Sequence, residues 1–457
     1  MTAAEPVTPP DPPVVPDRWG PLSEPVFRRY WCGQAVSHLG DRMTPVALAF
    51  AVLELTGSAT DLGLVVAANT VPLAVLILAG GVWADRLDRR LVMLGTDLAR
   101  ALVQGLLAVL LLTGTAQVWH LAVLAAASGA AQAFFQPAAT GMVPQVVSAQ
   151  RLGQANALVG MSQNAAMIVG PLLAGFLVAA ASPGAAIAVD AATFVVSALF
   201  LLRLGSIRPT PSERSTFVRE LVAGVREVSS RPWLAAMVIG FTVYHAVVLP
   251  GVLVLGPVIA DRRYDGAPSW AVVTAAFGVG AVLGSLLALR LRPRRPIVWC
   301  ALLLVGGSVQ PVLLGAGLPI AALAAAIAVS GAAISVLFII WDTTLAQQVP
   351  ATALSRVSSL DYFGSTVGMP VGFAVVGPVS QHLGLTRTTV VLSVVGVSWA
   401  LLKALLPSVR ALHAAPPDSN AAGTAVPART PHPPADPPTD QPLVPGPRPS
   451  PSVGDLP

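Results

Sequence analysis

Long apolar stretches separated by short polar turns constrain this chain more than any other feature. Each stretch reaches the roughly 20 residues that an α-helix needs to cross a bilayer. They are too long and too apolar for strands of a lipid-facing barrel, so only helices can satisfy their backbone groups in lipid. The sequence therefore predicts twelve spans, at about 31–56, 61–83, 91–113, 117–139, 155–180, 184–204, 233–260, 267–290, 296–317, 319–345, 357–381 and 385–406.

Composition excludes a water-soluble protein. The chain is 54% hydrophobic and 11% charged, whereas soluble chains carry about 25% charged residues. The predicted fold class is therefore an all-α polytopic membrane protein. Two distant cysteines, Cys32 and Cys300, and scattered histidines predict no disulfide, metal or cofactor.

The positions of the arginines explain the net charge of +5 better than a nucleic-acid partner does. Basic residues gather in cytoplasmic loops of membrane proteins. With a cytoplasmic N-terminus, the outer connections hold only Arg262, Arg263 and Arg387. We therefore expect a multi-pass cell-membrane protein with both termini cytoplasmic. The inner connections hold Arg86, Arg89, Arg90, Arg151, Arg208, Arg214, Arg219, Arg226, Arg231, Arg290, Arg292, Arg294, Arg295 and Arg356.

An internal repeat divides the chain into two parts of six spans each. IVGPLLAG in the fifth span matches VVGPVSQH in the eleventh, with Pro171 and Pro378 separated by 207 residues. Such parallel repeats are typical of secondary transporters. The predicted organisation is a disordered Pro-rich N-tail (1–25), a six-helix half (26–204), a basic cytoplasmic loop (205–232), a second six-helix half (233–408) and a disordered Pro-rich C-tail (409–457).

Ionisable residues within a span are costly and indicate function by default. Asp41 lies near the middle of the first span, and His38 and Gln34 share its helical face. We expect Asp41 and His38 to take up and release protons, although Asp41 could instead pair with Arg42 or with a neighbouring helix. Asp97 and Arg100, three residues apart in the third span, can pair with each other.

Uncharged polar side chains recur every three to four residues along several spans. In lipid they line either a helix contact or a water-filled cavity. A substrate that touches them would be mostly apolar with few charges. The candidates for lining a substrate cavity are Gln34, Asn69, Gln132, Gln136, Asn156, Gln163, Tyr244 and His245.

The turn GGVWADRLDRR gathers both signs of charge between two apolar spans. It matches the pattern G-x-x-x-D-R-x-x-R-R through Gly81, Asp85, Arg86, Arg89 and Arg90. The fifth span adds a Gly-Pro motif, with Gly170, Pro171 and Gly175. On these motifs and on LELTGSATDLG, the chain resembles the major facilitator superfamily, and most closely its drug and siderophore exporters of actinobacterial type.

The resemblance implies twelve transmembrane helices in two six-helix halves that work by alternating access. It also implies that the charged turn closes an inner gate, with Asp85 facing the start of the eleventh span and with Asp97 and Arg100 taking part. The second copy, GSLLALRLRPRR, keeps Gly284 and the arginines but has Ala288 in place of the aspartate. The gate is therefore expected to depend on the first copy alone.

Proton-coupled export of small amphipathic or hydrophobic compounds, such as a drug, secondary metabolite or siderophore, is the predicted function. The alternatives are an importer of the same fold and a non-transporting membrane sensor or structural protein. An ATP-driven pump is not expected, because a P-loop needs a lysine after its glycines and the single lysine, Lys403, lies in the last span. An enzyme is not expected either, because the six histidines are scattered and form no paired catalytic motif. The expected partners are a small-molecule substrate, protons and the lipid bilayer, and we expect a monomer.

Overall fold

The chain is built from α-helices that follow the predicted spans. The computed structural model describes residues 20–205 and 224–413, without the side chains of residues 78–79, 81–82, 84–86, 351–352, 355–356 and 359. Both predicted tails, apart from a few residues at their inner ends, and most of the predicted loop 205–232 lie outside these ranges. The prediction of helices, which rested on backbone hydrogen bonding in lipid, is confirmed.

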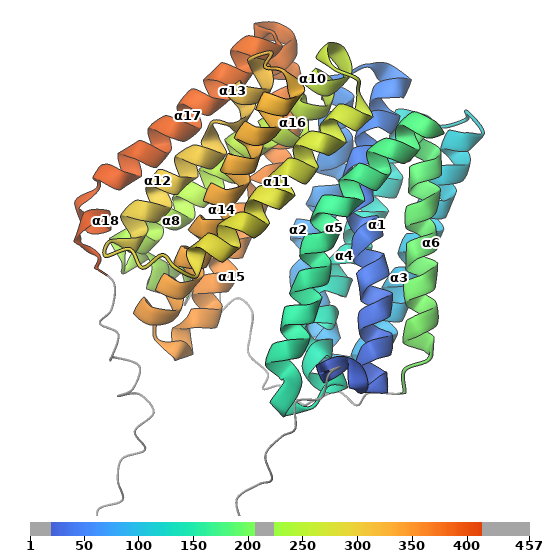
Figure 1. Cartoon of the computed structure of the whole chain (residues 1–457), viewed down its shortest axis with the longest axis horizontal. Helices are drawn as coiled ribbons and strands as arrows, with labels where there is room; N and C mark the ends of the chain where they lie inside the picture. The colour runs from blue at the N-terminus through green and yellow to red at the C-terminus, as the bar shows by residue number, and fades with distance from the viewer. Residues whose placement is uncertain (1–19, 206–223, 414–457) are drawn as a thin grey trace, which may run out of the picture. The chain divides into compact units, whose positions relative to one another are not determined.

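The first half comprises six helices joined by short turns (Figure 1). α2 packs along α4, α1 packs against α5 and α6, and α3 packs against α6. A short 3₁₀ turn, η1 (Gly20–Ser23), precedes the first helix, and η2 (Ala149–Arg151) precedes the fifth. The helices are α1 (Pro25–Thr56), α2 (Ala59–Arg86), α3 (Arg89–Leu112), α4 (Val118–Val146), α5 (Leu152–Ala180) and α6 (Pro183–Leu202).

The second half repeats this packing, since α11 packs along α14 as α2 packs along α4. Its elements are α8 (Pro232–Val243), the π-helical turn η3 (Tyr244–Val248), α9 (Leu249–Leu253), α10 (Leu255–Arg263), α11 (Ala267–Ala288), α12 (Pro296–Ser308), α13 (Gln310–Gly315), α14 (Ile320–Gln348), α15 (Ala351–Val367), α16 (Met369–Leu383), α17 (Leu385–Leu405) and α18 (Pro407–Ala411).

Three spans that the sequence predicts as continuous are interrupted in the structure. The breaks lie at Val254, Val309 and Gly368, each two or three residues before a proline. Proline has no backbone N–H and its ring clashes with the carbonyl four residues earlier, so the preceding turn opens. The seventh, ninth and eleventh spans therefore each consist of consecutive shorter helices.

Eleven stretches of the described helices are long and apolar enough to cross a membrane. The first predicted span, α1, is not among them, because His38, Asp41, Arg42 and Glu54 make it more polar than the others. α1 nevertheless runs for 32 residues and packs against both α5 and α6. Its polar residues therefore lie on a helix that the bundle itself surrounds.

Close contacts of glycines join the two halves. A Cβ placed on Gly175 of α5 would come within 2.5 Å of the Ala271 side chain in α11. A Cβ on Gly377 of α16 would come equally close, 2.5 Å, to the backbone of Thr60 in α2. Small residues permit such approach of helix backbones in membranes. The two halves therefore meet along the pairs α5–α11 and α2–α16.

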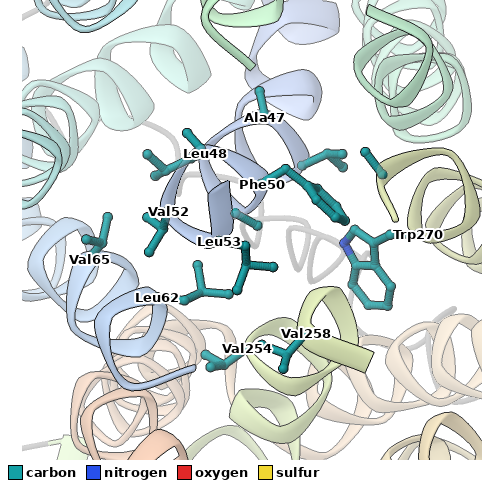
Figure 2. Packing of buried hydrophobic residues seen from close by; sticks show 14 of the residues in the cluster. Ala47, Leu48, Phe50, Val52, Leu53, Leu62, Val65, Val254, Val258 and Trp270 are labelled. Atoms are coloured by element: carbon teal, nitrogen blue, oxygen red, sulfur yellow. The ribbon is translucent and has the colours of Figure 1, made fainter. Parts of the chain in front are cut away.

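An apolar cluster that we call the inter-half cluster adds side-chain packing to these contacts (Figure 2). It joins Phe50, Leu53 and Leu62 of the first half to Val254, Val258 and Trp270 of the second. It lies near the connection between α1 and α2, and we call this end of the bundle the Gly57 end. The other two large clusters of the described residues each stay within one half.

We predict that Gly175→Val destabilises the protein, because the added side chain would overlap α11. Overpacking of this kind costs about 1–3 kcal/mol. Thermal melting of the purified protein in detergent measures the effect. Gly160→Val is the matched control, since it lies on the same helix and a Cβ there meets nothing within 4 Å. Equal melting temperatures for the two variants would contradict the prediction.

Candidate functional site

A buried ion network lies inside the first half, where α1, α3 and α6 meet. Its centre is Arg100 of α3, whose side chain is 2% exposed. Arg100 Nη1 donates to Asp41 Oδ1 at 3.2 Å, and Nη2 donates to Asp97 Oδ1 at 2.6 Å. Asp97 is 0% exposed, whereas the Asp41 side chain is 30% exposed. Asp41 is therefore the member of the network that its surroundings can reach.

Two aromatic rings sandwich the arginine. The Arg100 guanidinium carbon lies 4.1 Å from the ring centre of Phe135 in α4 and 4.2 Å from that of Phe194 in α6. The flat faces of a guanidinium stack on aromatic rings while its edges donate hydrogen bonds. The rings fill the space that water would otherwise occupy beside the cation. A lysine at this position could not make both kinds of contact.

Asp190 of α6 extends the network. Its Oδ2 accepts a hydrogen bond from Thr44 Oγ1 at 2.5 Å and one from Gln104 Nε2 at 2.7 Å. The carboxylate is fully buried, and it interacts electrostatically with Asp41 and Arg100. A satisfied carboxylate of this kind holds α1, α3 and α6 together.

The close approach of α1 and α6 depends on Gly40. A Cβ at this position would lie 2.2 Å from Asp190 Oδ1 and 2.2 Å from Thr193 Oγ1. No real Cβ atom tolerates such a distance. Gly40 therefore fixes the place at which the Asp190 carboxylate can face Thr44.

The balance of charge defines what the network can do chemically. Three carboxylates, Asp41, Asp97 and Asp190, face one guanidinium. With all groups ionised the network carries two uncompensated negative charges in a low-dielectric environment, which is costly. The Asp41–Arg100 ion pair therefore joins α1 to α3 within a network whose charges do not balance.

Several sequence predictions meet at this network. The Asp97–Arg100 pair is confirmed, and Asp41 pairs with a neighbouring helix, which was one of its open alternatives. His38 is half-buried and within electrostatic reach of Asp41. Gln34 donates from Nε2 to Ser197 Oγ at 3.3 Å, which ties α1 to α6.

Gln104 and Thr44 belong to the network, but the sequence did not predict them as site residues. Gln104 lies seven residues after Asp97 and four after Arg100, so all three share one helical face of α3. That spacing was a usable signal. Phe135 and Phe194 carried no comparable signal, because their roles arise only when α4 and α6 close over Arg100.

Two arginines of the charged turn bind backbone carbonyls within their own half. Arg89 Nη1 donates to Gly141 O of α4 at 2.5 Å, and Arg90 Nε donates to Leu201 O of α6 at 2.7 Å. Arg90 thereby satisfies carbonyls in the last turn of α6. The pair therefore ties the start of α3 to α4 and α6. Gly81, Asp85 and Arg86 belong to α2, but their side chains lie outside the described residues, so their role in a gate stays a prediction.

The Gly-Pro motif of α5 lies where three helices converge. A Cβ on Gly170 would come within 2.5 Å of the Arg42 side chain in α1, while Gly175 contacts α11 as described above. Pro171 is buried between them in the helix. The motif thus connects the helix that carries Asp41 to the second half.

The predicted cavity residues fall into different environments. Asn69 Nδ2 donates to Ala125 O of α4 at 2.9 Å, which makes it a helix contact. Gln132 is half-buried, and Gln136, Asn156 and Gln163 are exposed side chains of α4 and α5. Their role in a substrate cavity stays a prediction.

Two further candidates lie in the second half, on the π-helical turn η3. Tyr244 is buried among apolar side chains. His245 Nδ1 lies 2.8 Å from Phe241 O, and its ring packs edge-on against Tyr244. The structure therefore separates this pair from the ion network, which belongs entirely to the first half.

Lys403 is buried in the second half. The sequence places this lysine in the last span, and in α17 its side chain is 2% exposed and its Nζ lies 5.7 Å from the ring centre of Phe241. It packs so tightly against α8 that a Cβ on Gly240 would lie 2.0 Å from Nζ. A long lysine stem can follow an apolar surface, and here the whole side chain does so.

A family model described as transmembrane secretion effector matches residues 17–428. The chain belongs to this family. Macrolide efflux protein A of Streptococcus pyogenes is 28% identical over 57% of this chain and 65% of its own length. The match thus spans slightly less than two thirds of that relative. The multidrug efflux pump Tap of Mycolicibacterium fortuitum is 29% identical over 82% of this chain and 93% of its own.

Solved structures confirm the fold. The crystal structure of the nucleoside transporter NupG superposes with a TM-score of 0.66 at 13% identity, covering 83% of this chain and 98% of that one. The family and these relatives are transporters of the major facilitator type and not enzymes. The resemblance that the charged turn and the Gly-Pro motif suggested is therefore confirmed.

We predict that Arg100→Gln strongly destabilises the protein, because it leaves Asp97 buried without its ion-pair partner. Breaking a buried pair costs about 3–5 kcal/mol. Thermal melting of the purified protein in detergent measures the loss. Arg292→Gln, at an exposed position between α11 and α12, should melt like the unmodified protein.

A second variant separates charge from packing. Adding Asp97→Asn to Arg100→Gln removes the unpaired carboxylate, so the double variant should melt at a higher temperature than Arg100→Gln alone. If the double variant were the less stable of the two, the ion pair would not be the source of the effect.

Proposed function

We propose that the protein exports small amphipathic or hydrophobic compounds in exchange for protons, by alternating access. The observation that carries this proposal is the Asp41–Arg100–Asp97 network. It combines a half-exposed carboxylate with a buried cation inside a membrane helix bundle. Relatives named as macrolide and multidrug efflux pumps support export as the direction of transport.

A series of helix contacts connects the ion network to the interface between the halves. Asp41 lies on α1 next to Arg42, and the Arg42 side chain contacts α5 at Gly170. α5 in turn contacts α11 at Gly175. A change in the Asp41–Arg100 contact can therefore shift α1 against α5, and with it the junction of the two halves. Protonation of Asp41 is the event that we assign to this step.

Contacts between the halves at the Gly57 end bear on alternating access. The inter-half cluster closes the Gly57 end with apolar contacts between the halves. Among the described residues, one arginine hydrogen bond, from Arg262 to Gly57 O, also crosses between the halves at this end. From the distribution of arginines we propose that the Gly57 end faces the outside and that both termini are cytoplasmic.

The substrate class follows from the available side chains. Gln132, Gln136, Asn156 and Gln163 offer amide groups on α4 and α5 without adding charge. Such a surface suits an apolar molecule with a few hydrogen-bonding groups. Cells that express the protein should therefore accumulate less of a lipophilic dye such as ethidium than cells that do not.

We predict that Asp41→Asn abolishes dye export while leaving expression intact, because the amide cannot exchange a proton. Export rates from preloaded cells, measured with and without an uncoupler, test this, and we expect at least a tenfold loss. Asp265→Asn, at an exposed position of the connection between α10 and α11, is the matched control. Full export by Asp41→Asn would remove this residue from the mechanism. If cells retain the same amount of dye with and without the protein, export itself is refuted.

The charged turn generates a separate prediction. Asp85→Asn should slow export because the resemblance assigns the aspartate to the inner gate, whereas Ala288→Ser in the second copy should leave export unchanged. The same dye assay measures both, with membrane abundance as the reference. If export tolerates both substitutions equally, the charged turn serves only to set the orientation of the protein in the membrane.

A further inference from the structure

A cavity of about 540 Å³ opens at the Gly57 end, outside the ion network. Its wall includes Gly57, Ser58 and Ala59 from the first half. The rest comes from the second half, at the end of α10 and around the start of α17. The volume lies within the range of small-molecule sites, about 300–1,000 Å³. The pocket is therefore large enough for an organic ligand and depends on both halves.

Three arginines converge on this pocket: Arg262, Arg263 and Arg387. They are the same three that the sequence places in the outer connections, where orientation gives no reason for basic residues. More than 120 residues separate the first two from the third. None of the described residues that line the pocket carries a carboxylate. The site thus presents three positive charges without a local counter-charge in its wall.

Hydrogen bonds hold two of the guanidinium groups in place. Arg263 Nη1 donates to Gly315 O at 2.7 Å and its Nη2 donates to Thr386 Oγ1 at 2.9 Å. Arg262 Nη2 donates across the halves to Gly57 O at 3.3 Å. A guanidinium has five N–H donors, so both arginines keep donors for a ligand. Preorganised donors of this kind favour planar or tetrahedral oxyanions.

Helix termini add to the positive potential. α2 begins at Ala59 and α17 at Leu385, and both residues line the pocket. The first N–H groups of a helix have no partner within the helix and attract anions. Here they come together with the arginines on one cavity. Leu383 and Leu385 supply an apolar side to the same wall.

We propose that this pocket binds an organic phosphate, held by Arg262, Arg263 and Arg387 against the starts of α2 and α17. The phosphate belongs either to the headgroup of an anionic phospholipid or to a soluble ester. Because both halves form the wall, the ligand binds the form in which the Gly57 end is closed and stabilises that form by linkage. The binding site stands without the proposed transport function, and only an effect of the ligand on transport rests on it.

The test uses the purified full chain and glycerol 3-phosphate as the probe. The affinity of the protein for glycerol 3-phosphate is obtained from the rise in melting temperature in detergent as the probe concentration increases. Sodium chloride holds the ionic strength constant. Arg387→Gln is the decisive variant, because the structure shows no hydrogen bond from Arg387 to another described residue, so its removal leaves the fold intact. We expect about tenfold weaker binding in this variant. Arg292→Gln, an exposed arginine between α11 and α12, should bind like the unmodified protein.

Nanodiscs distinguish the two sources of phosphate. If a phospholipid headgroup occupies the pocket, the unmodified protein will melt at a higher temperature in phosphatidylglycerol discs than in phosphatidylcholine discs. Glycerol 3-phosphate will then cause no further rise in the phosphatidylglycerol discs. If a soluble ester is the ligand, glycerol 3-phosphate will stabilise the protein in both kinds of disc. In either case Arg387→Gln must weaken the effect. No stabilisation in any arm, or equal stabilisation of Arg387→Gln and the unmodified protein, overturns the proposal, and neither result bears on dye export.

Discussion

The placement of one cation in an apolar interior governs the first half of this protein. Arg100 cannot stay there unless its charge is compensated, and the carboxylates of Asp41 and Asp97, from two helices, accept hydrogen bonds from its two terminal nitrogens. Phe135 and Phe194 then cover its faces from two more. Four helices therefore take their mutual positions from a single side chain. An ion pair of this kind contributes less to stability than to specifying one arrangement.

The second half is organised differently. Its largest separate cluster is apolar. Among its described residues the one buried cation is Lys403, which lies near the Phe241 ring and has no hydrogen-bonded carboxylate. The halves share a helix-packing pattern but differ in chemistry. This asymmetry matches the charged turn, whose second copy lacks the aspartate. Duplication thus kept the scaffold, while the titratable network belongs to one copy.

Much of the fold followed from the sequence because lipid leaves a chain few choices. Length and apolar character located the spans, and the three-residue spacing of Asp97 and Arg100 predicted their pairing. Proline was less informative: Pro45, Pro72 and Pro171 remain inside continuous helices, whereas other spans break just before a proline. The partners of Asp41 and the convergence of Arg262 with Arg387 depend on tertiary packing. Residues that come together only through tertiary packing have no regular spacing in the sequence by which they could be predicted.

Gly40 has a consequence for how this protein can evolve. It has no side chain to react, bind or titrate, yet any other amino acid there would push a carbon atom into the Asp190 carboxylate and the Thr193 hydroxyl. Exposed side chains on α4 and α5 can change one at a time without such an overlap. Position 40 has no such freedom. Natural variation should therefore be frequent at the exposed positions of α4 and α5 and rare at position 40, where α1 packs against α6.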